Sequence, residues 1–259
     1  MVIGHFVMAI TAVLLAAGYA TRLYPLTKDR PKALLPLGRG TILDAVVDRL
    51  RDVPDVRRRV LVTNHRFVEQ FRQWQQRTQA DVQILDDGTE TPEGRLGAIR
   101  DVELARQASG GGDDLLVVGT DNLFRWPLKT FVVQAQRVRP HPSAALWQAP
   151  SAEAATQFGV VVRDASGRLT AFVEKSPQPP SQEVSLCVYY FPAAMGPMFQ
   201  RFFDEGGNPD APGYFIEWLV RTGRVHGIMM PGEWHDIGTP EEYEAVKHAW
   251  SGYESGSQT

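Results

Sequence analysis

The chain is poor in cysteine, because Cys187 is the single one among 259 residues, and this excludes an internal disulfide. Reducing compartments favour such cysteine usage, so we expect a cytoplasmic protein. Positive charge is not in excess either, and the formal net charge of -3 argues against a nucleic acid or a membrane surface as partner. The apolar run at residues 6–17 is too short to cross a bilayer, and no Lys or Arg precedes it as in a signal peptide.

Several common catalytic motifs are also missing from the sequence. It contains neither the Gly-x-x-x-x-Gly-Lys-Ser/Thr phosphate loop nor the Gly-x-Gly-x-x-Gly dinucleotide pattern. The six histidines show no His-x-x-x-His or Cys/His spacing, and there is no Gly-x-Ser-x-Gly nucleophile elbow. We therefore expect neither a zinc site nor a covalent serine intermediate.

Strand-like and helix-like segments alternate through the first half of the chain. An apolar run indicates a strand at residues 9–17, and further strand-like segments follow at 59–63, 82–85 and 115–119. The spacing of apolar residues indicates helices that begin after Thr41 and at residues 67–79 and 96–107. This alternation predicts an α/β fold, a doubly wound and mostly parallel sheet.

The pattern changes near residue 141, where short strands become frequent. They are expected at residues 144–148, 159–162, 169–174 and 184–191, with helices at 195–203 and 214–221. We expect a single domain over residues 1–250, with a first half at about 9–140 and a small β-rich second half at about 141–250. Residues 251–259 are predicted to form a disordered tail.

A loop rich in small residues follows the first expected strand, at the edge where open α/β sheets bind ligands. Backbone N–H groups of such a loop approach phosphates closely, which predicts a nucleotide-binding segment made of Ala16, Ala17, Gly18, Tyr19, Ala20 and Thr21. Arg22 and Lys32 add positive charge that neutralises a leaving pyrophosphate. The alternative interpretation is an ordinary strand-to-helix connection whose basic side chains are solvated.

Two aspartates from distant parts of the chain are candidates for a metal site. Asp121 follows the strand at residues 115–119, at the same sheet edge as the loop. Asp236 precedes a helix whose start is marked by Thr239, Pro240 and Glu242. Carboxylate oxygens suit Mg²⁺, and the position of Asp121 at the sheet edge makes it a candidate ligand for this ion. A turn aspartate and a helix-entry aspartate are the alternatives.

Together these segments resemble the signature of the sugar-1-phosphate nucleotidyltransferases, from the first strand to Tyr243. The resemblance implies a Rossmann-like fold and an enzyme that joins a nucleoside triphosphate to a sugar 1-phosphate with release of pyrophosphate. It implies Mg²⁺ as cofactor, held by Asp121 and Asp236, and it implies Arg22, Lys32 and Asp121 as catalytic residues. The first half would then bind the nucleotide and the second half the phosphorylated acceptor.

Further site residues are implied by the same resemblance. Glu174 and Lys175 match the family's Glu-Lys-Pro, and Gly159 matches a glycine that touches the sugar. The predicted acceptor-binding residues are Gly159, Glu174, Lys175 and Asn122. Arg95 and Gly97 take the place of a family segment near the nucleobase, although Arg95 fits a surface position equally well.

The chain departs from the family pattern at several positions. Ala20, Thr120 and Cys187 stand where glycine is usual, and Ser176 stands where proline is usual. A side chain at Cys187 would reshape the acceptor pocket. We therefore expect that the acceptor differs from glucose 1-phosphate, with a heptose, a cyclitol or a non-sugar phosphate as candidates.

Three alternative functions stay open at this point. A metal-dependent glycosyltransferase requires an Asp-x-Asp motif, which Asp121-Asn122-Leu123 lacks. A catalytically silent nucleotide-sugar-binding regulatory protein would keep the fold without turnover, and a cytidylyltransferase would take phosphocholine or a phosphonate as acceptor. The sequence is compatible with a homo-oligomer and leaves the nucleobase open.

Overall fold

The structure is a computed structural model that describes residues 8–254. Its strands are β1 (Ile10–Leu15), β2 (Pro36–Leu37), β3 (Gly40–Thr41), β4 (Val56–Thr63), β5 (Gln83–Asp86), β6 (Asp114–Gly119), β7 (Asn122–Phe124), β8 (Ser143–Gln148), β9 (Gly159–Arg163), β10 (Leu169–Glu174), β11 (Glu183–Phe191), β12 (His226–Met229) and β13 (Trp234–Asp236). Its helices are α1 (Ile42–Arg49), α2 (Val68–Thr78), α3 (Ala98–Ala108), α4 (Leu128–Arg137), α5 (Ala152–Ala155), α6 (Gly196–Asp204), α7 (Pro212–Val220) and α8 (Pro240–Ala249).

Nine strands of the described chain form one mixed sheet. Seven follow the order β10-β9-β11-β6-β1-β4-β5, while β8 pairs with β11 and β12 pairs with β8. The central strand β1 is parallel to both β4 and β6, and β5 is parallel to β4. Strand β11 joins the second half to the first by pairing antiparallel with β6. The carboxyl ends of β1, β4 and β6 consequently share one edge of the sheet.

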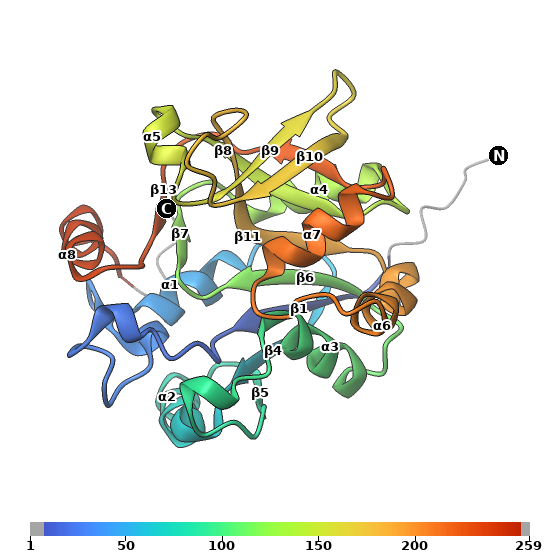
Figure 1. Ribbon diagram of the computed structural model, residues 1–259. Coiled ribbons are helices and arrows are strands. Elements are labelled where there is room, and N and C mark those ends of the chain that lie inside the picture. The colour runs from blue at the N-terminus through green and yellow to red at the C-terminus, as the bar shows by residue number, and fades with distance from the viewer. Residues whose placement is uncertain (1–7, 255–259) are drawn as a thin grey trace.

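Helices cover both faces of this sheet (Figure 1). The buried apolar residues of α1, α2 and α4 pack on one face, and those of α3, α6 and α7 pack on the other. Alternate residues of a strand point to opposite faces, so Leu14 of β1 belongs to the first layer and Val13 to the second. The predicted doubly wound α/β fold is confirmed, with its parallel strands in the first half and antiparallel pairs added by the second.

Most predicted elements are present with slightly different ends, and α1 begins where it was expected. The Thr41 side chain caps it by accepting a hydrogen bond from the Asp44 amide, and the Asp44 carboxylate accepts one from the Thr41 amide. Sequence analysis missed α4, although Leu128, Phe131 and Val132 are buried at helical spacing. It also missed β7, β12 and β13, since strands of three or four residues carry too short a pattern.

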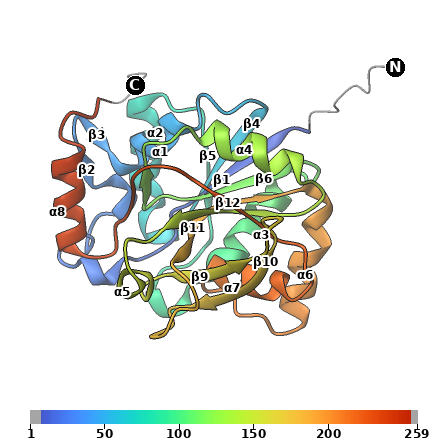
Figure 2. The same ribbon diagram turned by 90° about the horizontal axis from the view of Figure 1, so that it is seen from above.

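The C-terminal helix α8 lies beside the β2–β3 hairpin of the first half of the chain (Figures 1 and 2). Tyr243 Oη donates a hydrogen bond to the carbonyl oxygen of Pro36 at 2.8 Å. The prediction of a disordered tail from residue 251 is not met where the structure describes it, because Tyr253 packs against Trp250 and donates a hydrogen bond to Asp48. Residues 255–259 lie outside the described part of the chain.

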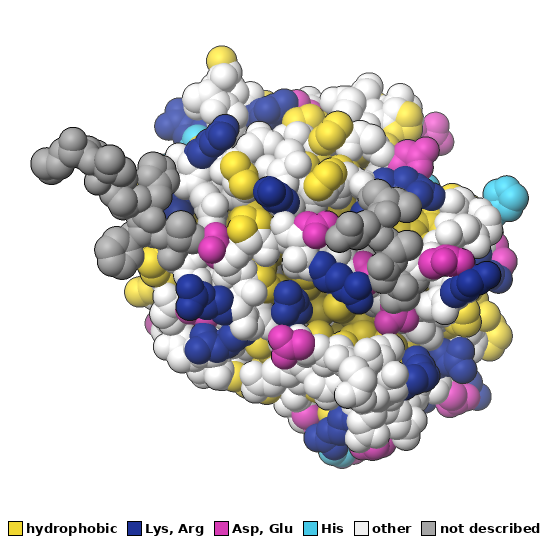
Figure 3. Space-filling view, turned by 180° about the vertical axis from the view of Figure 1, so that it is seen from behind, with side chains coloured by type: hydrophobic (Ala, Val, Ile, Leu, Met, Phe, Trp, Pro, Cys, Tyr) yellow, Lys and Arg dark blue, Asp and Glu magenta, His cyan; other side chains and the backbone are white. Residues whose placement is uncertain are grey.

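The surface carries mixed charge on the face opposite to the view of Figure 1. There, Lys and Arg side chains are interspersed with Asp, Glu and hydrophobic side chains (Figure 3). Within residues 8–254, no helix combines the length and the apolar character that a membrane crossing requires.

Candidate active site

Two adjoining cavities lie at the carboxyl ends of β1 and β6. The larger cavity has a volume of about 420 Å³ and is lined by most of the predicted nucleotide-binding loop, namely Ala16, Gly18, Tyr19, Ala20, Thr21 and Arg22. Lys32, Arg95 and Asp121 line it as well. The smaller cavity has a volume of about 200 Å³ and is lined by Gly159, Glu174, Lys175, Asn122 and Asp236. Arg22 lines both cavities, so the two predicted binding regions meet at this side chain.

The loop after β1 is held in place by side chains from two other segments. Thr27 Oγ1 donates a hydrogen bond to the Ala20 carbonyl at 2.7 Å, and Asn64 Nδ2 donates one to the Ala17 carbonyl at 2.9 Å. Ala20 adopts φ 48° and ψ 44°, the left-handed conformation that glycine enters without steric cost. This explains why glycine is usual at this position. Ala17 is buried and does not line the larger cavity, so its predicted phosphate contact is not supported by the geometry.

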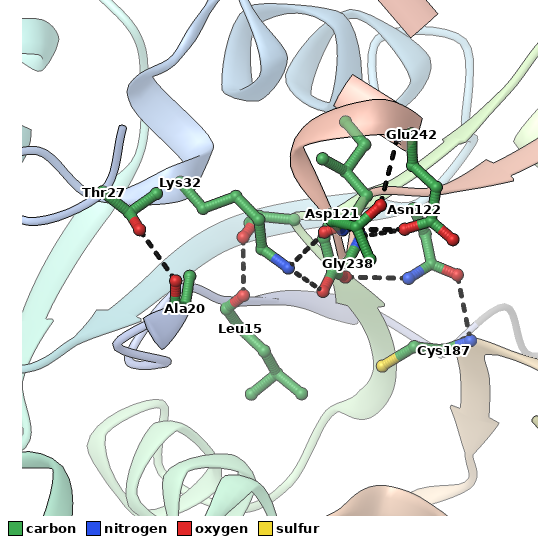
Figure 4. A network of polar contacts seen from close by, with 12 residues as sticks. Leu15, Ala20, Thr27, Lys32, Asp121, Asn122, Cys187, Gly238 and Glu242 are labelled. Carbon is green, nitrogen blue, oxygen red and sulfur yellow. Dashed lines mark hydrogen bonds and ion pairs between the residues drawn. The ribbon is translucent and has the colours of Figure 1, made fainter. Parts of the chain in front are cut away.

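Lys32 lines the larger cavity and joins three segments of the chain (Figure 4). Its Nζ donates to Asp121 Oδ2 at 2.7 Å and to the Ile237 carbonyl at 2.8 Å. Burial acts to raise the pKa of Asp121, but the positive charge and hydrogen bond of Lys32 outweigh it, so the pKa lies below its ordinary value. Asp121 is therefore an anion at neutral pH, with Lys32 as its present counter-ion.

Asp236 reaches the same place from the far end of the chain. Strand β13 pairs antiparallel with β7 and sets Asp236 opposite Asn122, the residue after Asp121. Burial and the negative charge of Asp121 raise the pKa of Asp236 to about 7. A negative charge on Asp236 beside the Asp121 anion is therefore costly, and the positive charges of Lys32 and Arg22 offset this cost only in part.

Asn122 has a role that sequence analysis did not assign. Its amide oxygen accepts hydrogen bonds from Trp234 Nε1 at 2.9 Å and from the Cys187 amide at 3.2 Å, and its Nδ2 donates to Asp121 Oδ1 at 2.8 Å (Figure 4). The side chain is buried, with 3% of its surface exposed. These contacts orient Asp121. Asn122 also borders the smaller cavity, so its acceptor contact stays a prediction.

Thr120 fits its position without strain. Its hydroxyl donates to the Leu15 carbonyl at 2.7 Å and so ties the end of β6 to the end of β1. Its φ is not among the positive values of the chain, so a β-branched residue is tolerated where the family usually has glycine. The departure at Thr120 leaves the loop that carries Asp121 in place.

The smaller cavity is shaped by a close approach between Gly159 and its neighbours. A Cβ on Gly159 would lie 2.4 Å from Phe172 Cζ and 2.9 Å from Glu174 Oε2, so a side chain is excluded there. Burial raises the pKa of the Glu174 carboxyl, and the Lys175 ammonium, 4.0 Å from Glu174 Oε1, partly opposes this. Lys175 is largely exposed at the cavity mouth, with φ 46°. Ser176 lies outside the lining of this cavity.

Arg95, which lines the larger cavity, pairs with Asp210, a residue that was not predicted. Arg95 Nε donates to Asp210 Oδ1 at 2.5 Å, and both residues line the cavity. Asp210 escaped prediction because one aspartate in a loop carries no distinctive pattern. Gly97, in contrast, is buried against Pro209 and does not line the cavity, so its predicted nucleobase contact is not supported by the geometry.

The donor set at the cavity junction is small. Within the described residues, no group of three or more His, Cys, Asp or Glu side chains is arranged to hold a metal ion. Asp121 and Asp236 supply two carboxylates, and the remaining ligands of any ion there would have to be water or substrate oxygens. Such a sparse set of hard oxygen ligands fits Mg²⁺, which keeps several waters and binds through one or two carboxylates plus phosphates.

Comparisons with known proteins agree on one family. The profile of the family described as "Nucleotidyl transferase" matches residues 11–251. The chain is 29% identical over 237 residues to the UTP–glucose-1-phosphate uridylyltransferase AglF of Haloferax volcanii, covering 91% of this chain and 94% of that protein. It is 26% identical over 231 residues to the bifunctional protein GlmU of Methanocaldococcus jannaschii, covering 88% of this chain but 51% of that protein. The chain thus spans about half the length of this GlmU.

A solved structure shows the same fold. It belongs to a Bacillus anthracis protein assigned as a glucose-1-phosphate thymidylyltransferase, in complex with sucrose, and gives a TM-score of 0.82 over 96% of this chain and 98% of that one, at 20% identity. The chain is also 25% identical over 241 residues to mannose-1-phosphate guanylyltransferase 1 of Arabidopsis thaliana, covering 90% of this chain and 62% of that protein. Because the profile covers most of its length, the chain belongs to the nucleotidyl transferase family, and the predicted resemblance to the sugar-1-phosphate nucleotidyltransferases is confirmed.

Proposed function

We propose that this protein condenses a nucleoside triphosphate, bound in the larger cavity, with a sugar 1-phosphate or a similar phosphorylated acceptor, bound in the smaller cavity. One observation carries the proposal: the Lys32–Asp121 pair and the Asp236 carboxylate lie where the two cavities meet, with Arg22 lining both. A phosphate from each side would meet at this junction. The similarity to AglF, over nearly the whole of both chains, supports the same reaction class.

The chemistry proposed is direct transfer. An oxygen of the acceptor phosphate attacks the α-phosphorus of the triphosphate, and the bond from that phosphorus to the α–β bridging oxygen breaks. The leaving pyrophosphate takes the electron pair. Arg22 and Lys32 stabilise the charge that builds on the phosphates, and the loop after β1 aligns the triphosphate through its backbone amides. No protein nucleophile is required.

We propose Mg²⁺ as the cofactor, with Asp121 and Asp236 as its protein ligands. Two observations support the fit: the charge of Asp121 raises the pKa of Asp236, and the charges of Lys32 and Arg22 oppose this rise only in part, so the pair favours a further cation. When bound, the ion would withdraw charge from the phosphate oxygens. Asn122 keeps Asp121 oriented toward this point through the hydrogen bond to Asp121 Oδ1.

A second class of acceptor is favoured by the aromatic lining of the smaller cavity. Phe158, Phe172, Tyr189 and Trp234 border it together with Glu174. Aromatic faces beside a carboxylate attract a quaternary ammonium group. Phosphocholine or a related phosphonate is therefore the second candidate acceptor, and the reaction would be the same transfer to a non-sugar phosphate.

A substrate matrix tests the proposal. The common nucleoside triphosphates are combined with sugar 1-phosphates, cyclitol phosphates and phosphocholine, with and without Mg²⁺, and pyrophosphate is measured. We expect release from a few pairs and only when both substrates and Mg²⁺ are present. Release that does not depend on the acceptor would indicate a hydrolase, and binding without release from any pair would indicate a regulatory nucleotide-sugar-binding protein.

The single cysteine supports a cytoplasmic setting for the reaction.

A further inference from the structure

One short segment forms part of the wall of both cavities. Asp210 lines the larger cavity, and the next three residues, Ala211, Pro212 and Gly213, line the smaller one. The last two of these open helix α7. A ligand that orders one end of this four-residue segment also restricts the other end, since planar peptide bonds leave only two soft dihedrals per residue.

The same segment is attached to the loop that carries Arg95. Two backbone hydrogen bonds join them, from the Ala98 amide to the Asp210 carbonyl at 3.3 Å and from the Ile99 amide to the Pro209 carbonyl at 3.0 Å. Gly97 makes this approach possible, because its φ is +94° and a Cβ there would lie 2.6 Å from the Pro209 carbonyl oxygen.

An ion pair between side chains that line the larger cavity also connects the Arg95 loop to the Asp210 segment. Arg95 donates from Nε to Asp210 at 2.5 Å and from Nη1 to the Pro92 carbonyl at 3.0 Å. The two side chains are about half exposed, at 52% and 45%. An isolated pair this exposed contributes little to global stability. Its position suggests a different use, since Asp210 fixes the direction of the guanidinium that lines the larger cavity.

We propose that Asp210 is a positioning residue that holds Arg95 toward the bound nucleotide and, through the Ala211–Gly213 wall, couples occupancy of the two cavities. This inference rests on the proposed function for the identity of the two ligands. A nucleotide that orders Arg95 also orders Asp210 and the Ala211–Gly213 wall. The acceptor then loses less conformational entropy when it binds, because the wall is already ordered. Thermodynamic linkage requires the effect to be equal in both directions.

Equilibrium binding tests the coupling without turnover. The probes are α,β-methylene analogues of the nucleoside triphosphates, which cannot release pyrophosphate, and the Kd of each is measured with and without a saturating acceptor phosphate. In the wild-type chain we expect the acceptor to lower the analogue's Kd by about 5- to 20-fold. The coupling ratio is the analogue's Kd without acceptor divided by its Kd with acceptor. In Asp210→Asn we expect this ratio to lie within about twofold of one.

Two further variants separate positioning from mere structural support. The charge-exchanged pair Arg95→Asp with Asp210→Arg keeps an ion pair across the junction and should restore part of the ratio. Glu69→Gln removes the carboxylate of another exposed pair, Arg72–Glu69 on α2, and should leave the ratio unchanged. Under turnover, Asp210→Asn should raise the KM of both substrates by about 3- to 10-fold while kcat stays within about twofold.

The outcomes are distinguishable from those of the proposed function. A ratio unchanged in Asp210→Asn, or a wild-type ratio of one, overturns the coupling even if pyrophosphate is released. Absence of pyrophosphate from the whole matrix overturns the proposed function, yet a ratio lost in Asp210→Asn and regained in the exchanged pair would still support the coupling.

Discussion

Lys32 Nζ lies 2.7 Å from Asp121 Oδ2 and 2.8 Å from the carbonyl oxygen of Ile237, residues that are 89 and 205 positions further along the chain. One ammonium group therefore fixes the relative positions of the loop after β1, the end of β6 and the segment before α8. That third segment also carries Asp236. The contact assembles the charged junction between the two cavities.

Replacing Lys32 should impair turnover far more than folding. Lys32→Ala removes a cation that faces the phosphates, and loss of one such preorganised charge lowers kcat by about 100- to 1,000-fold. Pyrophosphate release at saturating substrates measures the effect. Lys28→Ala removes an exposed lysine of the same loop and should retain wild-type activity. Equal activity of the two variants would contradict the role given to Lys32.

Replacing Asp121 or Asp236 should change the Mg²⁺ dependence of turnover, whereas replacing an exposed acidic residue elsewhere should not. Asp121→Asn and Asp236→Asn each remove one predicted Mg²⁺ ligand, so we expect kcat to fall by about 100-fold or more and the Mg²⁺ concentration for half-maximal rate to rise. Chelation of divalent cations should abolish wild-type release. Glu241→Gln, at an exposed position of α8, is the control. Undiminished release by the wild-type chain in excess chelator would contradict the metal site.

The loop after β1 should tolerate glycine but not a β-branched residue at position 20. Ala20 is left-handed, so Ala20→Gly removes a steric cost and adds unfolded-state entropy of similar size, changing the free energy of unfolding by less than about 0.5 kcal/mol. Ala20→Val should lower it by about 1–2 kcal/mol. Denaturant titration checks both values. Ala152→Val, exposed on helix α5, is the control, and equal losses in the two valine variants would be inconsistent with left-handed strain.

The sequence predicted the parts of the site that local patterns mark, and it did not predict the parts that depend on contacts between distant residues. The loop after β1, Asp121 and Asp236 follow local patterns of apolar strand, small residues and helix cap, and those patterns located them. Asp210 depends on a contact between loops 115 positions apart, which no local pattern encodes. At Gly97 the sequence indicated a ligand contact, but the structure requires glycine there because the Pro209 backbone lies too close for a side chain.

The same distinction applies to the fold. The alternation of strand-like and helix-like segments predicted the doubly wound half, because its central strands β1 and β6 are mostly apolar. Strand β13 consists of Trp234–Asp236 and exists through its pairing with β7, so its residues alone gave no signal. The roles of Asn122 and Lys32 likewise depend on partners brought together by that pairing.

Stability should fall as pH rises, in a way traceable to Asp101. Burial, assisted by the charge of Asp87, raises the pKa of Asp101 from 3.8 to about 8, and its Oδ1 has no hydrogen-bond partner within the described chain. Between those two pH values the folded state binds more protons than the unfolded state at this group, so the free energy of unfolding decreases as pH increases. The contribution is intact below the unfolded-state pKa and is fully lost above the folded-state pKa.

Asp101→Asn tests this sign. The variant should gain stability over the wild-type chain, and the gain should grow by on the order of a few kcal/mol between about pH 5 and pH 8. Denaturant titrations at several pH values give the difference. Asp81→Asn, whose side chain is 97% exposed, is the control for the substitution itself. A gain for Asp101→Asn that is independent of pH would rule out the titration of this carboxyl.

Phosphorus NMR of a complete reaction tests the central claim most directly. With the active triphosphate, the acceptor phosphate and Mg²⁺, the account predicts that the acceptor's phosphorus signal is replaced by the two coupled signals of a pyrophosphate diester, in equal amount to free pyrophosphate. An acceptor signal that stays unchanged while the triphosphate is consumed would contradict nucleotidyl transfer at the Lys32–Asp121 junction.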